Sequence, residues 1–293
     1  MEVSVIGTGA MGTAVVERLL ATGHDITIFN RSPGRMPPLE KKGARVAKSA
    51  RAAVESTPVV ISLVVDAPAM DEMILTDEIV PLFAGKTFLK MTTTNGRVAR
   101  EVYTTIGNAG GTCLDIAILN FPDDVSNGKM HAMVGASKAD FEAWAPLMAD
   151  LGPKILHSGE VGTASIAENA MIQIMMFHVV TFAYGLAVFE RANLPQDVLM
   201  AATRENPLFQ IPLGDYFRDR MINRDFVPPL YRLVKHTNDM QLTIDDMEDL
   251  GIMADGVRSL RELFVRAVER GLDENDYSAI YDIICPRSES TNA

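Results

Sequence analysis

The sequence predicts an α/β protein that consists of a doubly wound α/β domain, a long helix and an all-α domain. Three observations lead to this class. Short apolar runs typical of buried strands alternate with helical patterns from Val3 to Leu156. An apolar stretch without proline then extends from Gly162 to Arg191, and only helical periodicity follows it. The 293 residues are enough for two domain cores, and we expect the parts to be residues 1–158, 159–191 and 192–293.

The first strand, Val3 to Ile6, is followed at once by a glycine-rich turn, Gly7-Thr8-Gly9-Ala10-Met11-Gly12. A helical pattern from Ala14 to Ala21 and a second strand from Asp25 to Phe29 complete a strand–turn–helix–strand unit. In this context the glycines let the backbone turn tightly and approach a pyrophosphate that lies at the helix N-terminus. The unit predicts an N-terminal Rossmann dinucleotide-binding domain. A turn that binds no nucleotide is the alternative.

The residues after the second strand, Asn30-Arg31-Ser32 with Arg35 close behind, indicate which dinucleotide is bound. NAD-binding domains usually carry Asp or Glu here, which binds the ribose 2′-hydroxyl. A 2′-phosphate would be repelled by a carboxylate and bound by a guanidinium. We therefore predict NADPH as the cofactor, bound at least about tenfold more tightly than NADH. The alternative is that Arg31 and Arg35 are only solvated charges.

The alternation continues to the end of the first domain. Helices are expected at 47–55, 68–75, 95–107 and 138–151. Strands are expected at 59–65, 87–91, 113–118, 130–135 and 154–156. This order is typical of a doubly wound sheet, whose ligand lies at the carboxyl ends of the strands.

The apolar stretch from Gly162 to Arg191 would form a helix roughly 45 Å long, at about 1.5 Å per residue. It is apolar on nearly every face beyond Asn169, so we expect it to be buried all round. A membrane span is an alternative of suitable length, but Gln173, His178 and Thr181 lie in its middle and no second such segment exists. We favour a helix that joins two domains, packs on both and is available to a second subunit.

One carboxylate, Glu168, lies near the start of this stretch. A carboxylate at a helix N-terminus is stabilised by the helix dipole. The other explanation is a residue directed at a site between the domains. Position alone favours neither.

Composition excludes some partners and some chemistry. The net charge of -11 argues against nucleic acid and anionic membrane surfaces. The two cysteines, Cys113 and Cys285, fit a reduced cytosolic protein and provide no zinc-binding spacing, so no metal is expected. The chain begins directly on a strand without a basic and apolar leader, which favours a cytoplasmic location.

Together these features resemble the β-hydroxyacid dehydrogenase and imine reductase superfamily over essentially the whole chain. The resemblance rests on the glycine turn, on Leu63-Val64-Val65, on Met91-Thr92-Thr93-Thr94, on Asp115-x-Ala117 and on the closing run from Gly271 to Ala279. It implies a homodimer that exchanges C-terminal helices around the long helix, with an active site between one subunit's cofactor domain and the partner's helical domain. With the motifs above, the expected cofactor-binding residues are Gly7, Thr8, Gly9, Ala10, Met11, Gly12, Asn30, Arg31, Ser32, Arg35, Leu63, Val64, Val65 and Thr93.

Three positions separate the two branches of the superfamily. Hydroxyacid dehydrogenases have a Ser-Gly-Gly turn that binds the substrate carboxylate, whereas this chain has Leu119-Asn120-Phe121, where a carboxylate would lose its hydrogen bonds. Their catalytic lysine on the long helix is replaced here by Glu168. Their Lys-Asp pair in the C-terminal domain is replaced by Asn238-Asp239.

The imine reductase branch is more similar. Its Asp-x-Ala-Ile-x-x-x-Pro pattern matches Asp115 to Pro122, and its Gly-x-Ala-x-x-x-Asp-x-Ala pattern matches Gly162 to Ala170. Glu168 in the aspartate position is a departure that keeps the carboxyl group. Reduction of a ketone requires a donor to the forming oxyanion, which lysine supplies, whereas an iminium ion is already cationic. We therefore predict reduction of imines, including reductive amination of ketones, with Glu168 as the catalytic residue.

Two roles are open for Glu168: counter-ion to an iminium, or proton donor to a neutral imine if burial raises its pKa. The expected substrate-binding residues are Leu119, Asn120, Met171, Ile172 and Met175, with Phe209, Tyr216 and Phe226 as further candidates in the helical domain. The expected partners are a small-molecule imine, ketone or amine and a second copy of the chain, with no nucleic acid and no membrane.

Two other functions stay open. One is a hydroxyacid or aldehyde reductase that uses Tyr184, Tyr216 or Tyr231 in place of the usual lysine. The other is a protein that binds the cofactor without turnover and serves as a sensor or partner.

Overall fold

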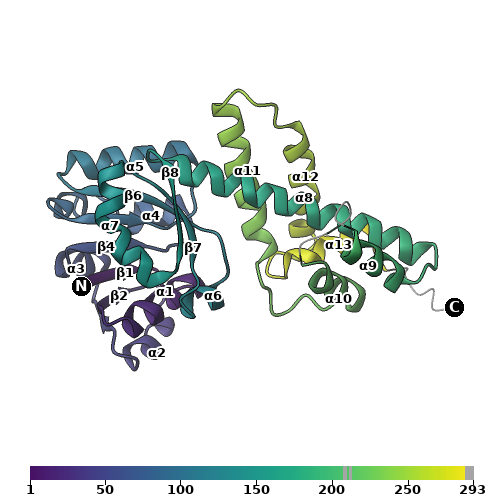
Figure 1. Cartoon of the computed structure of the whole chain (residues 1–293), viewed down its shortest axis with the longest axis horizontal. Coiled ribbons are helices and arrows are strands. Elements are labelled where there is room, and N and C mark those ends of the chain that lie inside the picture. The colour runs from purple at the N-terminus through teal and green to yellow at the C-terminus, as the bar shows by residue number, and fades with distance from the viewer. Residues whose placement is uncertain (207–209, 211–212, 288–293) are drawn as a thin grey trace. The chain divides into compact units, whose positions relative to one another are not determined.

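The computed structural model describes residues 1–206, 210 and 213–287, and the chain divides into two compact units, Met1–Glu168 and Asn169–Ala293 (Figure 1). The division falls inside one long helix, α8 (Thr163–Arg191), whose first turns belong to the first unit. The boundaries expected from the sequence, at residues 158 and 191, lie on either side of this point.

The first unit is built around one sheet. Its strands are β1 (Glu2–Ile6), β2 (Asp25–Phe29), β3 (Arg45–Val46), β4 (Val59–Ser62), β5 (Thr87–Lys90), β6 (Thr112–Ile118), β7 (His131–Gly135) and β8 (Lys154–Gly159). The strand order is β3-β2-β1-β4-β5-β6-β7-β8. Neighbouring strands are parallel except β6 and β7, so β7 and β8 run opposite to the others. The first six strands have the order of a dinucleotide-binding doubly wound sheet, which confirms the predicted fold class.

Helices cover both faces of this sheet (Figure 1). One face packs against α1 (Ala10–Ala21), α2 (Pro37–Glu40), α6 (Pro122–Ser126) and α7 (Lys138–Leu151). The other face packs against α3 (Ala50–Ser56), α4 (Ala67–Met73), the 3₁₀ helix η2 (Val80–Phe83) and α5 (Gly96–Asn108). Successive strand residues point to opposite faces, so Val59 and Ile61 join one core and Val60 joins the other. Burial on both faces explains why the strands appear as continuous apolar runs.

Local caps set the start of several helices. The residues before α3, α4, α5 and α7 each accept a backbone N–H of the first turn through their side chains, and they are Ser49, Asp66, Asn95 and Ser137. The Ser49 cap is the reason that α3 begins at Ala50, later than the predicted residue 47. Helix α1 differs, because it begins at Ala10 directly after Gly9 and has no side-chain cap. Its first turn lies inside the glycine motif, so the apolar pattern revealed only the part from Ala14 onward.

Two further differences from the predicted elements concern short segments. Strand β4 ends at Ser62 rather than at Val65, because the chain turns at Leu63 to pack against the glycine turn. The elements β3, α2, α6 and the 3₁₀ helix η1 (Pro33–Arg35) were not predicted, since they are too short for periodicity to be visible.

The second unit is helical over its described elements. After α8 these are α9 (Gln196–Glu205), α10 (Gly214–Asn223), α11 (Leu233–Asp249), α12 (Asp255–Glu269), the 3₁₀ helix η3 (Tyr277–Ile280) and α13 (Tyr281–Ile284). Helices α11 and α12 pack side by side (Figure 1). One face of α8 contributes Met176, Val179, Phe182 and Leu186 to the core of this unit.

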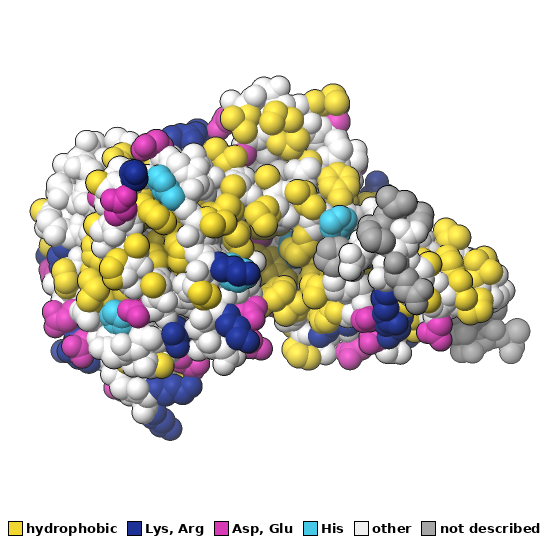
Figure 2. Space-filling model, in the orientation of Figure 1, with side chains coloured by type: hydrophobic (Ala, Val, Ile, Leu, Met, Phe, Trp, Pro, Cys, Tyr) yellow, Lys and Arg dark blue, Asp and Glu magenta, His cyan; other side chains and the backbone are white. Residues whose placement is uncertain are grey.

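Another face of α8 is exposed in the single chain, so the chain alone does not bury the helix all round. Its exposed apolar side chains, with their exposed fractions, are Met171 (48%), Ile174 (57%), Phe177 (38%), Tyr184 (49%) and Val188 (62%). Figure 2 shows hydrophobic side chains, in yellow, exposed at the surface of the chain. Within the described chain, α8 is also the one helix whose length and composition would allow it to cross a membrane, although 39% of its most apolar window is buried.

The closing run of the superfamily pattern has a structural role in the second unit. Asp276, Tyr277 and Ser278 are completely buried. The Asp276 carboxylate accepts hydrogen bonds from the Ser278 N–H and hydroxyl and from the Leu230 N–H. These bonds join the start of η3 to the segment before α11, so the run is explained by packing.

Candidate active site

The glycine turn leaves no space for side chains at two of its three glycines. Gly7 has φ +103°, and a Cβ there would lie 2.3 Å from the Leu63 carbonyl oxygen. A Cβ on Gly12 would lie 2.0 Å from the Gly7 carbonyl oxygen. At Gly9 the nearest atom is Arg35 Nη1, 3.7 Å from the Cβ position, so the backbone can be approached there. Gly7 and Gly12 therefore allow the backbone to pack tightly, and Gly9 leaves its backbone open to a pyrophosphate. A pyrophosphate-binding turn requires both features.

The turn is held by Asn30, which follows β2. The Thr8 N–H donates to Asn30 Oδ1 at 2.9 Å, and Asn30 Nδ2 donates to the Ser32 carbonyl at 2.9 Å. Thr8 Oγ1 is buried and has no hydrogen-bond partner among the described residues. An uncapped helix N-terminus and a buried hydroxyl without a partner both fit a phosphate group. The residues present therefore fit a dinucleotide cofactor.

The two arginines that were predicted to bind a 2′-phosphate have different surroundings. Arg35 lies beside Gly9 of the glycine turn. Arg31 Nη1 donates to Glu72 Oε2 of α4 at 2.8 Å, and both side chains are 64% exposed. The two guanidinium groups are thus not equivalent, and Glu72 is a carboxylate that the sequence pattern did not indicate.

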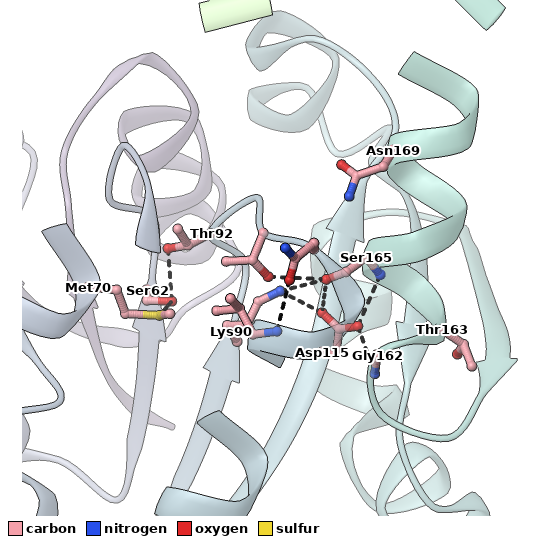
Figure 3. Close-up of polar contacts among 12 residues, drawn as sticks. Ser62, Met70, Lys90, Thr92, Asp115, Gly162, Thr163, Ser165 and Asn169 are labelled. Carbon is pink, nitrogen blue, oxygen red and sulfur yellow. Dashed lines mark hydrogen bonds and ion pairs between the residues drawn. The ribbon is translucent and has the colours of Figure 1, made fainter. Parts of the chain in front are cut away.

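The loops after β4 and β5 lie next to each other. Leu63 packs against Gly7, and the Val64 N–H donates to Thr92 Oγ1 at 3.3 Å. Thr92 Oγ1 in turn donates to Ser62 Oγ at 3.1 Å (Figure 3). Val65 is 47% exposed and Thr93 is half-buried. Thr92 and Ser62 therefore hold the two strand ends together beside the expected cofactor residues.

A buried polar network lies at the carboxyl end of β5 (Figure 3). Lys90, 1% exposed, donates from Nζ to Asp115 Oδ1 at 2.6 Å and to Ser165 Oγ at 2.8 Å. The Ser165 hydroxyl donates to the same Asp115 oxygen at 2.7 Å. Burial alone would raise the pKa of Asp115, but the Lys90 charge and the hydrogen bonds from Lys90 and Ser165 outweigh it and place this pKa below its usual range.

Lys90 was missed by sequence reasoning although a signal was present. It interrupts an apolar run, Phe88 to Met91, that was itself predicted as a strand of a doubly covered sheet. A lysine in such a strand is buried, and a buried charge needs a partner. The register of the parallel strands places Asp115 directly beside it.

Glu168 lies on α8 one turn beyond Ser165 and is 9% exposed. Residues three apart are neighbours on a helix surface, and helical side chains tilt toward the N-terminus. Glu168 therefore neighbours the turn that contains Ser165. It is a nearly buried carboxylate at the end of the cofactor-binding unit.

The residues predicted to bind substrate in the first unit are engaged in a loop. The Leu119 N–H donates to the His131 carbonyl at 2.8 Å. Asn120 Nδ2 donates to the Lys129 carbonyl at 2.8 Å, and Asn120 Oδ1 accepts the His131 N–H at 3.1 Å. The Asn120 amide thus holds the connection between β6 and β7, and binding a substrate through it would compete with these bonds.

The predicted substrate residues of the second unit divide by exposure. Met171 is on the exposed face of α8, whereas Ile172 and Met175 are half-buried against the helical core. Phe226 is buried in that core, and Phe209 lies outside the described residues. Asn169, at the start of this unit, donates from Nδ2 to Asp246 Oδ2 of α11 at 2.7 Å.

Two of the tyrosines considered as proton donors are bound to carboxylates. Tyr216 donates to Asp276 Oδ2 at 2.8 Å and Tyr231 donates to Asp239 Oδ2 at 2.7 Å. Burial and the neighbouring Asp276 raise the pKa of Tyr216 well above its ordinary value, which makes it a weaker acid. Tyr184 is 49% exposed. In the part of the chain that the structure describes, no group of three or more His, Cys, Asp or Glu residues could hold a metal ion.

Several known proteins are similar to this chain in sequence or in structure. The model of the NAD binding domain of 6-phosphogluconate dehydrogenase matches residues 2–159. Glyoxylate/succinic semialdehyde reductase 1 of Arabidopsis thaliana is 23% identical, over 97% of this chain and 98% of its own length. The imine reductase from Myxococcus stipitatus in complex with NADP+ is 25% identical with a TM-score of 0.68, covering 97% of this chain and 100% of its own. The 3-hydroxyisobutyrate dehydrogenase from Salmonella typhimurium shares the fold, with a TM-score of 0.86 at 20% identity and coverage of 97% and 99%.

Proposed function

Since this chain belongs to the family of the NAD binding domain of 6-phosphogluconate dehydrogenase, within the β-hydroxyacid dehydrogenase and imine reductase superfamily, we propose that it is an NADPH-dependent imine reductase. The observation that carries the proposal is Glu168, a nearly buried carboxylate in the position where hydroxyacid dehydrogenases have their lysine. Reductive amination of ketones is included, because it proceeds through the same C=N bond.

When bound, NADPH supplies the hydride that reduces the C=N carbon. Glu168 acts on the nitrogen in one of two ways. As a carboxylate it holds an iminium ion by charge, an attraction that is weakly screened because the side chain is only 9% exposed. As a carboxylic acid it donates a proton to a neutral imine. Neither role requires a donor to an oxyanion, so the absent lysine is not needed.

The preference for NADPH is supported by the residues that follow strand β2, where the ribose of a dinucleotide is expected to bind. Asn30 occupies the position after β2 where a carboxylate would bind a 2′-hydroxyl, and its amide is used to hold the glycine turn. Arg31 and Arg35 both supply guanidinium groups near this strand end. The imine reductase from Myxococcus stipitatus was solved with NADP+ and is 25% identical to this chain.

A second candidate function is reduction of an aldehyde such as glyoxylate or succinic semialdehyde, which is favoured by the name of the Arabidopsis relative. This reaction requires a donor to the forming alkoxide. Two of the candidate donors, Tyr216 and Tyr231, already donate to buried carboxylates. Because these two tyrosines are already engaged, imine reduction is favoured over aldehyde reduction.

The deciding experiment compares the unaltered protein with Glu168→Gln. The change keeps size and hydrogen bonding but removes the charge and the acidic proton. We expect kcat/KM for a cyclic imine, a pyrroline or dihydroisoquinoline, to fall roughly a hundredfold, while the affinity for NADPH stays within about threefold. Glu168→Asp should retain much of the activity.

Glu160→Gln is the matched control, because Glu160 is an exposed carboxylate just before α8. It should leave imine turnover unchanged. Full activity of Glu168→Gln would reject the assigned role, and turnover of glyoxylate but not of imine would favour the second candidate. NADPH binding without any turnover would instead favour a non-catalytic protein.

We also propose that the protein is a homodimer that uses the exposed apolar face of α8. The exposed residues Met171, Ile174, Tyr184 and Val188 recur at helical spacing and form one stripe. The opposite face is already packed in the core of its own unit, which favours a second protein surface over lipid as the partner of this stripe. Sedimentation at micromolar concentration tests the proposal, and a stable active monomer would reject it.

A further inference from the structure

The long helix α8 lacks the local features that usually stabilise a helix start. The residue before it, Gly162, has φ +96° and no side chain that could act as a cap. The first turn of α8 contains no acidic residue. The backbone N–H groups and the dipole at this end must therefore be satisfied from elsewhere in the chain.

Asp115 of β6 supplies what the helix lacks. Its Oδ2 accepts the N–H of Gly162 at 3.1 Å and the N–H of Ser165 at 3.0 Å, across 47 and 50 residues of sequence (Figure 3). Its Oδ1 accepts the Ser165 hydroxyl and the Lys90 ammonium. Both carboxylate oxygens are thus in use, and Asp115 is completely buried.

Lys90 holds this carboxylate in position. The two residues are register partners on adjacent parallel strands, so the sheet itself sets the separation of their backbones. The ammonium also donates to Ser165 Oγ, so that Lys90, Asp115 and Ser165 form a closed triangle of hydrogen bonds. A buried charge pair of this kind tolerates little displacement, because moving one charge would leave the other buried without its counter-charge.

The start of α8 is further located by close packing on α5. A Cβ on Gly162 would lie 2.9 Å from the Gly96 carbonyl oxygen, and a Cβ on Gly96 would lie 2.5 Å from the Ile166 side chain. The triangle therefore fixes the rotation and height of a helix turn that is already pressed against its neighbour. Glu168 lies one turn further along the same helix, next to Ser165 on its surface.

We propose that Lys90 and Asp115 are positioning residues for Glu168: by capping α8 from the sheet they set where the Glu168 carboxyl lies. This proposal rests on the proposed function, since it takes Glu168 to be the group that acts on the substrate nitrogen. Neither Lys90 nor Asp115 touches the reactants in this account. They act only through the first turn of the helix.

The test uses the full-length protein and the double variant Lys90→Met/Asp115→Asn, which removes both charges at nearly constant volume. We expect hydrogen exchange of the Gly162 and Ser165 amides to become more than about tenfold faster, because the charged acceptor of these bonds is lost. The kcat for a cyclic imine should fall about tenfold with KM little changed, because the substrate-reactive group is displaced rather than the binding surface. The NADPH dissociation constant should stay within about threefold.

Lys86→Met is the matched control. Lys86 donates from Nζ to the carbonyls of Val54 and Thr57, so it is also a lysine that anchors a helix end to this unit, but at α3. Its replacement should leave both the exchange at Gly162 and the kcat unchanged. If the double variant does not fold, Ser165→Ala carries the test with a smaller expected fall in kcat of about twofold to fivefold, since only the hydroxyl bonds of the triangle are lost.

Any of four results would overturn the proposal. Unchanged exchange in the folded double variant would show that Asp115 does not cap the helix. Faster exchange with unchanged kcat would show that the cap does not position Glu168. Full activity of Glu168→Gln would reject the proposed function and this inference together, whereas a strong loss in Glu168→Gln with a fully active double variant would reject the positioning role alone.

Discussion

One buried cluster in each unit can be compared, because the two clusters accommodate their polar groups in opposite ways. In the first unit Lys90, Asp115 and Ser165 form a network in which each side chain has hydrogen-bond partners. In the second unit His236 is 1% exposed, and neither of its ring nitrogens has a hydrogen-bond partner among the described residues. It is packed instead between aromatic rings, with centroid distances of 4.2 Å to Tyr231 and 4.5 Å to Tyr277.

The difference shows what each cluster requires of its buried groups. The cluster of the first unit uses charge to hold a helix start against a sheet, so both charged partners are needed together. In the second cluster His236 is held by ring packing and kept neutral, because burial and the nearby Lys235 charge lower the pKa of His236 well below its ordinary value. Loss of Lys90 or Asp115 alone should therefore lower the stability of the protein. Replacement of His236 by an apolar ring should leave the stability unchanged or raise it.

The largest effect is expected from Lys90→Met. This change leaves Asp115 buried without its counter-charge and should lower the free energy of unfolding by about 3–5 kcal/mol, as for other broken buried ion pairs. Urea unfolding measures the loss. Lys129→Met, at an exposed position, is the control and should change stability by less than about 0.5 kcal/mol.

The double variant Lys90→Met/Asp115→Asn sharpens the same point, because two neutral partners need no counter-charge and should restore most of the lost stability. A loss below about 1 kcal/mol in the single variant would contradict the view that this pair is strictly matched.

The second prediction compares two surfaces, the exposed apolar stripe of α8 and the surface of α5, rather than two buried clusters. Ile174→Asp places a charge on the exposed apolar stripe of α8 and should weaken the proposed dimer at least about a hundredfold, on the order of 2.7 kcal/mol. Sedimentation equilibrium measures the change. Tyr103→Asp is the control, because Tyr103 is 44% exposed on α5 of the first unit, and it should leave the dimer intact. Equal weakening by both changes would remove the contrast between the two surfaces.

The third prediction concerns pH and the second unit. The pKa of His236 is lower in the folded than in the unfolded chain, so below about pH 6.5 the unfolded chain binds a proton first and folding loses stability as pH falls. The slope from this residue should be about 1.4 kcal/mol per pH unit, with no contribution above that pH. His236→Phe keeps the ring packing, so it should abolish this part of the slope and be neutral or stabilising at pH 7.5.

Urea unfolding at a series of pH values compares His236→Phe with His157→Phe, a control at an exposed position. The control should keep the slope of the unaltered protein. Identical slopes in all three proteins would mean that His236 takes up a proton without unfolding.

The smallest effect is expected at the exposed ion pair of the first unit. Glu72 holds Arg31 through a pair whose members are both 64% exposed, so the pair itself contributes little to stability. Its removal by Glu72→Gln frees Arg31 and takes a negative charge from the neighbourhood of a 2′-phosphate. The NADPH dissociation constant should fall about twofold to fivefold with that for NADH unchanged or raised.

Fluorescence titration of both cofactors measures this ratio. Arg31→Ala should act in the opposite direction and erase most of the NADPH preference, and Glu78→Gln serves as a control on another exposed carboxylate of the first unit. A Glu72→Gln protein with an unchanged ratio would mean that Arg35, beside Gly9, binds the phosphate alone.

The sequence by itself determined the features whose chemistry is local. The turn from Gly7 to Gly12 could be predicted because only glycine fits at Gly7 and Gly12, where a Cβ would collide with backbone. The alternating apolar runs predicted the doubly wound sheet because its strands are covered on both faces. The position of Glu168 followed from the resemblance, since the spacing from Gly162 is counted along one helix.

Only the tertiary structure decided how the polar groups are paired. Asn30 with Thr8, Arg31 with Glu72 and Asp115 with Gly162 are separated by 22, 41 and 47 residues. No periodicity or local motif relates residues so far apart, because their distance depends on strand order and register. The helix α8 makes this plain: its own first turn carries neither a capping side chain nor an acid, and the sheet supplies both through Asp115.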